Sequence, residues 1–266
     1  MLLEIEDLDV SFRNEEGAET AAAKDVSLTL DRGEVLGLVG ESGSGKSSVA
    51  MSVARLQPSP PPVWPKGRIH FDGVDTLKMS VPELRQIRGS RIGVVFQDPI
   101  GSLSPLHRIG DQLVETVRLH RDVSAPAARA MALEWLQKVG IPDPAVRAAA
   151  FPHELSGGMQ QRVMIAMGLM LEPDLVIADE PTTALDVTIQ AQILDLLDEL
   201  KRRLGLSLLF ITHDLGVVQH IADRVVVMHR GRIVEQGACD EVLKSPKDEY
   251  TRYLMAAVPR IGKPLA

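Results

Sequence analysis

The sequence predicts an α/β protein, in which a core of buried parallel strands joins an antiparallel β subdomain and is interrupted by a helical insertion. The first observation is a set of short, continuous apolar runs that each end in polar residues, at 35–39, 92–96, 175–178 and 208–211. Such runs are typical of strands buried on both faces of a parallel sheet. Near-alternation of apolar residues over 1–34 favours antiparallel strands instead, and helical patterning occupies much of 98–155.

Length and composition agree with a globular chain. The 266 residues are 45% hydrophobic and 24% charged, which is enough to bury a sizeable core. Acidic residues number 36 and basic residues 29, so the net charge of −7 argues against a protein that coats nucleic acid. Aromatic residues make up only 3% of the chain, which argues against a platform for stacking bases. We therefore expect no nucleic acid partner.

The cysteine content and hydropathy indicate a cytosolic setting. Cys239 is the only cysteine, which excludes an intrachain disulfide and four-cysteine metal centres. A reducing compartment is expected for such a chain. The first residues lack the basic and apolar regions of a signal peptide, and no run approaches the roughly 18 apolar residues of a membrane helix. Any membrane association is therefore expected to come through a partner.

The remaining elements follow in order along the chain. Five prolines lie between Gln57 and Gly67, a density that predicts an exposed connection with no regular element. Helical patterning around 113–119 and over 125–139, the second segment Ala-rich and amphipathic, predicts the helices of the insertion. The apolar spacing over 236–266 predicts a short helical tail.

A glycine-rich motif follows the first apolar run. Residues 40–47 fit the pattern G-x-x-x-x-G-K-[ST] and precede a plausible helix over 47–55, which is the context of a phosphate-binding P-loop. Its backbone N–H groups and the helix N-terminus would hold phosphate oxygens. Lys46 would reach the β- and γ-phosphates, and the Ser47 hydroxyl would bind Mg²⁺. A glycine-rich turn is the alternative. The candidate nucleotide-binding residues are Gly40, Glu41, Ser42, Gly43, Ser44, Gly45, Lys46, Ser47 and Ser48.

Two further segments suit nucleotide hydrolysis. Asp179 ends an apolar run and is predicted to assist Mg²⁺, and Glu180 follows it in a position to polarise a water molecule. Ser156, Gly157 and Gly158 open a predicted helix over 159–171, which provides a second helix N-terminus suited to phosphate. Because this second site has no lysine of its own, it suggests a nucleotide held between two bodies. The alternatives are solvated carboxylates and a glycine-rich helix cap.

Taken in order, these motifs resemble the ATP-binding subunit of an ABC transporter, over roughly residues 3–260. The motifs are the P-loop, Gln97, the segment Leu155-Ser156-Gly157-Gly158-Met159-Gln160, the strand ending at Glu180, Asp186 and His213. The resemblance implies a P-loop NTPase (RecA-like) core with an antiparallel β subdomain and an inserted α-helical subdomain. It implies one nucleotide-binding domain over 1–266, with the core at 1–97 and 157–235. The helical subdomain is expected at 98–156, and the tail at 236–266.

The resemblance also implies a role for each matching residue. Gln97 would sense Mg²⁺ or water and couple to the membrane partner, and His213 would contact the γ-phosphate. Residues 156–158 would contact the nucleotide of the opposite subunit, Asp186 would cross the dimer interface, and Phe12 would stack on adenine. The implied catalytic residues are Glu180, His213, Gln97 and Lys46, and the implied Mg²⁺ ligands are Ser47, Gln97 and Asp179.

A narrower resemblance points to the branch that imports peptides, nickel or opines. It rests on the segments 96–105, 152–154, 180–187 and 212–218, and on Tyr250-Thr251-Arg252, before which Asp248-Glu249 replace the branch's His-Pro. It implies an ATP- and Mg²⁺-dependent ATPase that energises uptake of such a solute through permease subunits. A second ATPase subunit and, indirectly, an extracytoplasmic solute-binding protein are implied, at the cytoplasmic face of a bacterial-type membrane. The alternative is a soluble ABC ATPase of a non-transport complex, such as a carbon–phosphorus lyase-type assembly.

Overall fold

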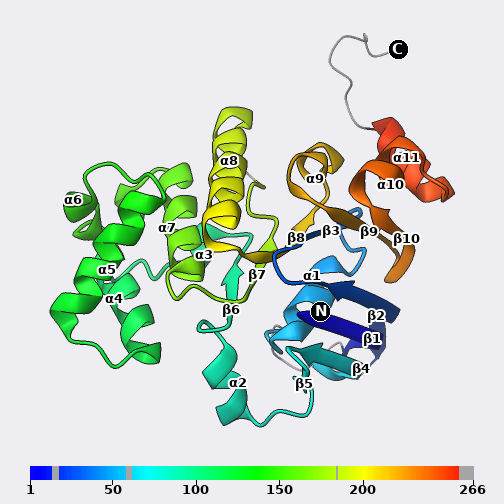
Figure 1. Ribbon diagram of the computed structural model, residues 1–266, viewed down its shortest axis with the longest axis horizontal. Coiled ribbons are helices and arrows are strands. Elements are labelled where there is room, and N and C mark those ends of the chain that lie inside the picture. The colour runs from blue at the N-terminus through cyan, green and yellow to red at the C-terminus, as the bar shows by residue number, and fades with distance from the viewer. Residues whose placement is uncertain (14–17, 58–61, 184, 258–266) are drawn as a thin grey trace. The chain divides into compact units, whose positions relative to one another are not determined.

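The computed structural model describes residues 1–13, 18–57, 62–183 and 185–257 (Figure 1). Its contacts divide the chain into two compact units. The first comprises Met1–Lys78 and Leu209–Ala266, and the second comprises Met79–Leu208. The predicted α/β class is confirmed, whereas the predicted subdomain boundaries near 97, 156 and 235 stay a prediction.

The first unit contains an antiparallel sheet with the strand order β2-β1-β4-β5 (Figure 1). Its strands are β1 (Leu3–Arg13), β2 (Glu19–Leu30), β4 (Pro62–Phe71) and β5 (Val74–Asp75). Leu3, Ile5, Leu8 and Val10 of β1 are buried, and residues between them are more exposed. This is the pattern of a sheet that buries one face, as the alternation over 1–34 predicted.

The prediction of no regular element between Gln57 and Gly67 was wrong, because β4 begins inside that segment. Pro62 is the first residue of β4, a position that tolerates a missing N–H donor. Pro65 lies where the register with β1 shifts, between the pairs Lys66↔Asp9 and Val63↔Ser11. Prolines are accepted at strand starts and at bulges, and β4 uses both positions.

The second sheet region of the first unit leads to the predicted P-loop. β3 (Val35–Val39) pairs in parallel with β9 (Arg224–His229), and β9 pairs antiparallel with β10 (Arg232–Ala238). The helices of this unit are α1 (Lys46–Val53), α9 (Leu215–Ile221), α10 (Cys239–Lys244) and α11 (Glu249–Ala257). All five residues of β3 are buried, so the P-loop starts from a fixed strand end.

The second unit is mainly helical (Figure 1). Its parallel pair, β6 (Ile92–Val95) and β7 (Leu175–Asp179), matches two of the predicted apolar runs. A third run forms β8 (Ser207–Thr212), which carries the chain from this unit into the first. The helices are α2 (Val81–Ile87), α3 (Pro99–Ser102), α4 (Ile109–His120), α5 (Ala125–Lys138), α6 (Pro144–Ala148), the 3₁₀ turn η1 (Pro152–Glu154), α7 (Gly157–Leu169) and α8 (Val187–Leu204).

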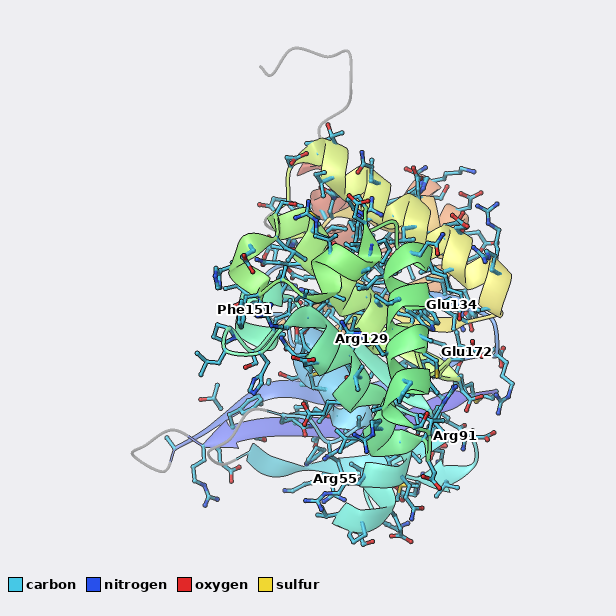
Figure 2. All side chains as sticks on the ribbon, turned by 90° about the vertical axis from the view of Figure 1, so that its left-hand side faces the viewer. Arg55, Arg91, Arg129, Glu134, Phe151 and Glu172 are labelled. Atoms are coloured by element: carbon cyan, nitrogen blue, oxygen red, sulfur yellow. The ribbon has the colours of Figure 1, made fainter. Side chains whose placement is uncertain are left out.

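The helical insertion has its own buried seam. Trp135 and Leu136 of α5 are buried, as are Leu113 and Val117 of α4. Arg129 and Glu134 of the same helix are exposed (Figure 2). Within the described residues, no helix is long and apolar enough to cross a bilayer.

Glu235 of β10 anchors the segment that leads into α11. Its carboxylate accepts hydrogen bonds from the backbone N–H groups of Lys247 (2.9 Å) and Asp248 (3.1 Å). Burial by itself would raise the pKa of Glu235. The hydrogen bonds to its carboxylate lower the pKa by more than burial raises it, so the pKa lies below the ordinary value of 4.5. A carboxyl group whose pKa is lowered by folding stabilises the folded state above its ordinary pKa, and this contribution is lost as the pH falls through the lowered value.

We predict that α11 loosens as the pH falls below 4.5, the ordinary glutamate pKa, and through the lowered pKa of Glu235. Amide-exchange protection factors over residues 249–257 should drop in the wild-type chain between pH 6 and pH 3.5. The Glu235→Gln variant should already show reduced protection at pH 6, with a smaller further drop in acid. Glu241→Gln, which changes an exposed carboxylate of α10, is the matched control. Equal pH profiles for wild type and Glu235→Gln would contradict this role of Glu235.

Candidate active site

The loop over residues 40–45 folds around the lysine that follows it. The Nζ of Lys46 donates hydrogen bonds to the carbonyl oxygens of Gly40 (2.8 Å) and Glu41 (2.9 Å), and to Oγ of Ser44 (3.4 Å). The lysine is only 4% exposed. A buried ammonium group is costly unless acceptors surround it, and here the loop itself supplies them. The loop therefore holds a fixed positive charge at the start of α1.

Two glycines let this loop lie against neighbouring backbone. A Cβ atom on Gly40 would lie 2.2 Å from the carbonyl oxygen of Met228, and one on Gly45 would lie 2.1 Å from that of Ala22. Gly45 also has a φ of 98°, which side chains rarely adopt. The carbonyl oxygen of Ser44 accepts from the N–H of Gly231 at 3.0 Å. Backbone from β2 and the β9–β10 turn thus packs around the P-loop.

The N-terminus of α1 suits an anion. Its N-cap, Gly45, provides no side-chain cap, so the first-turn N–H groups are not occupied by one. Such N–H groups and the helix dipole attract phosphate oxygens. Ser47 is exposed on this first turn, and Ser48 is half-buried. The role of Lys46 and the start of α1 in holding phosphate stays a prediction, and this geometry is compatible with it.

Two other candidates lie in the first unit. His213 is exposed immediately after β8 and precedes Asp214, whose carboxylate caps α9 by accepting from the N–H of Gly216 at 2.8 Å. Phe12 is half-buried in β1, opposite Thr20 of β2. The roles of His213 and Phe12 toward a nucleotide stay predictions.

The second unit brings Gln97 and Glu180 together. Glu180 follows β7, is 9% exposed, and has a positive φ of 46°. Its Oε2 accepts hydrogen bonds from Nε2 of Gln97 (3.1 Å) and from Oγ1 of Thr183 (2.8 Å). Asp179, the last residue of β7, is 7% exposed. The carboxylate of Glu180 is therefore held in one orientation, as a general base must be.

Thr183 was not identified from the sequence. The N–H of Thr183 donates to the carbonyl oxygen of Glu180 at 3.1 Å, which closes a turn with Pro181 in its second position. Proline favours this position of a turn. The Glu-Pro-Thr-Thr sequence was therefore a usable signal, because a turn after Glu180 returns a hydroxyl to its carboxylate.

The segment that opens α7 lies next to the Asp186 turn. Ser156 is the N-cap of α7 and accepts from the N–H of Met159 at 3.4 Å, and Asp186 caps α8 by accepting from the N–H of Ile189 at 2.9 Å. A Cβ atom on Gly158 would lie 2.9 Å from the side chain of Ile189. A Cβ atom on Gly157 would meet nothing within 4 Å. Ser156, Gly157 and Asp186 are exposed, so an outside group can approach them.

A family model described as ABC transporter matches residues 23–183, which include the P-loop, Gln97, residues 156–158 and Glu180. The chain belongs to the ABC transporter family. It is 50% identical over 260 residues to the oligopeptide transport ATP-binding protein OppD of Bacillus subtilis, an alignment that covers 98% of this chain and 72% of that protein. It is 52% identical to the peptidoglycan transport ATP-binding protein YejF of Agrobacterium fabrum, over 99% of this chain but only 48% of that relative.

Solved structures of ABC proteins share the fold. The dimeric ATP-binding cassette MJ0796, in a post-hydrolysis state with ADP and Pi, aligns with a TM-score of 0.79 at 29% identity and covers 90% of this chain and 99% of that one. The cbiO1 protein of Clostridium perfringens, part of the ABC transporter complex cbiONQ, aligns with a TM-score of 0.74 at 32% identity, covering 98% and 97%. This ABC chain is an ATP-binding protein and an ATPase.

The clash at Gly45 gives a direct test of the P-loop packing. Alanine at Gly45 or at Gly43 carries the cost of a left-handed backbone, about 1–2 kcal/mol. Only the Gly45→Ala side chain would also collide with backbone, which should add about 1–3 kcal/mol. Urea unfolding without nucleotide should therefore show a larger loss for Gly45→Ala than for Gly43→Ala. Equal losses would contradict the packing described above.

Proposed function

We propose that this ABC ATPase energises the uptake of peptides, or of a related small solute such as nickel or an opine, through a membrane permease. The observation that supports it best is the identity of about half over nearly the whole chain to relatives named for peptide transport, OppD among them. The buried Lys46 and the oriented Glu180 carboxylate supply the chemistry of ATP hydrolysis.

The ATP site is proposed to be shared by two ATPase subunits. Each nucleotide would lie between the P-loop of one subunit and Ser156, Gly157 and Gly158 of the other, with Asp186 at the interface. The open surface at Gly157 supports this arrangement, as does the dimeric state of the MJ0796 neighbour. The second subunit would be identical or a close paralogue.

The individual residues would act mainly by position and charge. Lys46 and the N–H groups of residues 40–48 would hold the phosphates, His213 would contact the γ-phosphate, and Phe12 would stack on adenine. Glu180, oriented by Gln97 and Thr183, would accept a proton from the attacking water. No covalent enzyme intermediate is needed for phosphoryl transfer of this kind.

Ser47, Asp179 and Gln97 are the proposed Mg²⁺ ligands. Among the described residues, no group of three or more His, Cys, Asp or Glu side chains could hold a metal ion by itself. Mg²⁺ is usually held by one or two protein groups together with substrate phosphates and water. When bound, the ion would neutralise charge that develops on the phosphates.

The permease is proposed to dock on the segment that follows β6. Apolar side chains are exposed there, with Phe96 41%, Ile100 72% and Leu106 82% exposed. Exposed apolar side chains in one short segment suit contact with a partner protein. The chain would therefore act at the cytoplasmic face of the membrane, with an extracytoplasmic solute-binding protein delivering the solute to the permease.

Replacing Glu180 by glutamine tests the proposed base. The amide cannot accept the proton, so ATP hydrolysis should fall by at least about 100-fold while ATP still binds. Phosphate release and calorimetry measure the two properties. Glu199→Gln, on the exposed side of α8, should leave both unchanged. Hydrolysis near the wild-type rate in Glu180→Gln would refute the role of Glu180.

Replacing Ser156 by arginine tests the shared site. In the Glu180→Gln background, the added bulk and charge should abolish ATP-dependent dimers in sedimentation while each monomer still binds ATP. Ser124→Arg is a matched control, because Ser124 caps α5 with the same 3.4 Å hydrogen bond that Ser156 makes in α7. Dimerisation should survive in Ser124→Arg. If Ser156→Arg formed ATP-dependent dimers as stable as those of Ser124→Arg, the proposal that two subunits share the ATP site would be refuted.

The transport assignment is tested in native membranes. A tagged Glu180→Gln chain, trapped with ATP, should co-purify with polytopic permease subunits and a second ATPase, identified by mass spectrometry. Recovery of soluble enzymes alone would show a non-transport ATPase and overturn the importer assignment. The matched variant is Ile100→Asp, in the exposed segment that follows β6. This variant should no longer co-purify with the permease but should still bind ATP.

A further inference from the structure

The hydroxyl of Tyr250, on α11, reaches the P-loop. Its oxygen accepts a hydrogen bond from the backbone N–H of Glu41 at 3.1 Å. The two residues are 209 positions apart, and neither the glycine-rich motif nor the helical pattern of the tail predicted the contact. Tyr250 is thus a group from outside the motif that binds the loop backbone directly.

The Glu41 N–H belongs to the same peptide unit as the Gly40 carbonyl. That carbonyl oxygen accepts from Nζ of Lys46 at 2.8 Å. Because a peptide unit is planar and normally trans, its N–H and C=O point in opposite directions. One rigid plane is therefore held at both ends, by Tyr250 on its amide side and by Lys46 on its carbonyl side. Hydrogen bonds arranged in series in this way also strengthen one another.

The ring of Tyr250 is fixed in place. It stacks on His229 of β9 with 3.8 Å between ring centroids and an angle of 3° between planes. It also packs against the buried cluster that includes Val39 of β3 and Val227 of β9. Those two residues are paired across the strands, so the cluster that Tyr250 packs against includes the last residue of the strand that leads into the P-loop. Burial raises the pKa of Tyr250, which keeps its hydroxyl neutral.

The start of α11 is fixed as well. The carboxylate of Asp248 caps it by accepting from the N–H of Tyr250 at 2.8 Å. Glu235 of β10 holds the two preceding N–H groups, as described above. Asp248 thus supplies an N-cap. The hydroxyl of Tyr250 is presented by an anchored helix turn and not by a frayed end.

We propose that Tyr250 is a positioning residue for ATP binding. Its hydroxyl fixes the peptide unit between Gly40 and Glu41, so that the two loop carbonyls hold the Lys46 ammonium group at the phosphate site. The proposal rests on the assigned role of Lys46 in binding ATP. Tyr250 touches no reacting atom in this scheme, so its effect falls on ATP affinity and not on the chemical step.

The test compares the two tyrosines of the chain, Tyr250 and Tyr253. Tyr250→Phe keeps the stacked ring and removes only the hydroxyl, while Tyr253→Phe makes the same change on a side chain that is 62% exposed. We expect Tyr250→Phe to raise KM and Kd for ATP about threefold to tenfold, the effect of one hydrogen bond. Its kcat should stay near wild type, and Tyr253→Phe should match wild type throughout.

Two outcomes of this comparison overturn the proposal. One is an unchanged KM for ATP in Tyr250→Phe, with or without a lower Tm, which would leave Tyr250 a packing role only. The other is a fall in kcat with KM unchanged. If the wild-type chain itself bound no ATP, the assignment of Lys46 would fail instead, and calorimetry on the wild type separates these cases.

A spectroscopic measurement covers the case in which Tyr250→Phe does not fold. Incorporation of 3-fluorotyrosine gives two ¹⁹F resonances, because the chain has two tyrosines, and Tyr253→Phe assigns them. Addition of ATP should shift the resonance of position 250 more than that of position 253. An unshifted resonance at position 250, in a chain saturated with ATP, would contradict the proposal.

Discussion

The buried ammonium group of Lys46 is the interaction on which the P-loop depends. A cation that is 4% exposed requires acceptors, and the loop provides the carbonyls of Gly40 and Glu41. The loop keeps this path around Lys46 because Gly40 and Gly45 lie against neighbouring backbone, where a side chain would collide. β3 is buried over its whole length, which fixes the point where the loop begins.

Much of the fold could be predicted from apolar patterning. The runs at 35–39, 92–96, 175–178 and 208–211 became β3, β6, β7 and β8, with ends that differ by at most one residue. Strands buried on both faces have continuous apolar sequences, which makes them easy to recognise. The prediction for the proline-rich segment was wrong because that segment becomes a strand only by pairing with β1. Pro62 and Pro65 are tolerated only at the start of β4 and at its register shift against β1.

In the site too, residues in short motifs could be predicted from the sequence, whereas contacts between residues far apart in the chain could not. Lys46 and Ser156 could be recognised because their motifs lie within a few residues of the chain. Gln97 and Glu180 are 83 positions apart, and the sequence did not predict the hydrogen bond between them. Thr183 required knowledge of a turn, and Tyr250 required the folded chain, because it meets Glu41 across 209 positions. Contacts of this kind depend on how elements pack, and residue spacing does not carry that information.

The most direct test of this account is a calorimetric titration of ATP into the wild-type chain and the Lys46→Ala variant. The account predicts saturable binding by the wild type and an affinity at least about tenfold weaker without the ammonium group, a loss typical of a hydrogen bond to a charged group. Lys244→Ala, which removes an exposed charge on α10, should bind as the wild type does. Equal ATP affinity in Lys46→Ala and wild type would contradict the central role given to the buried lysine.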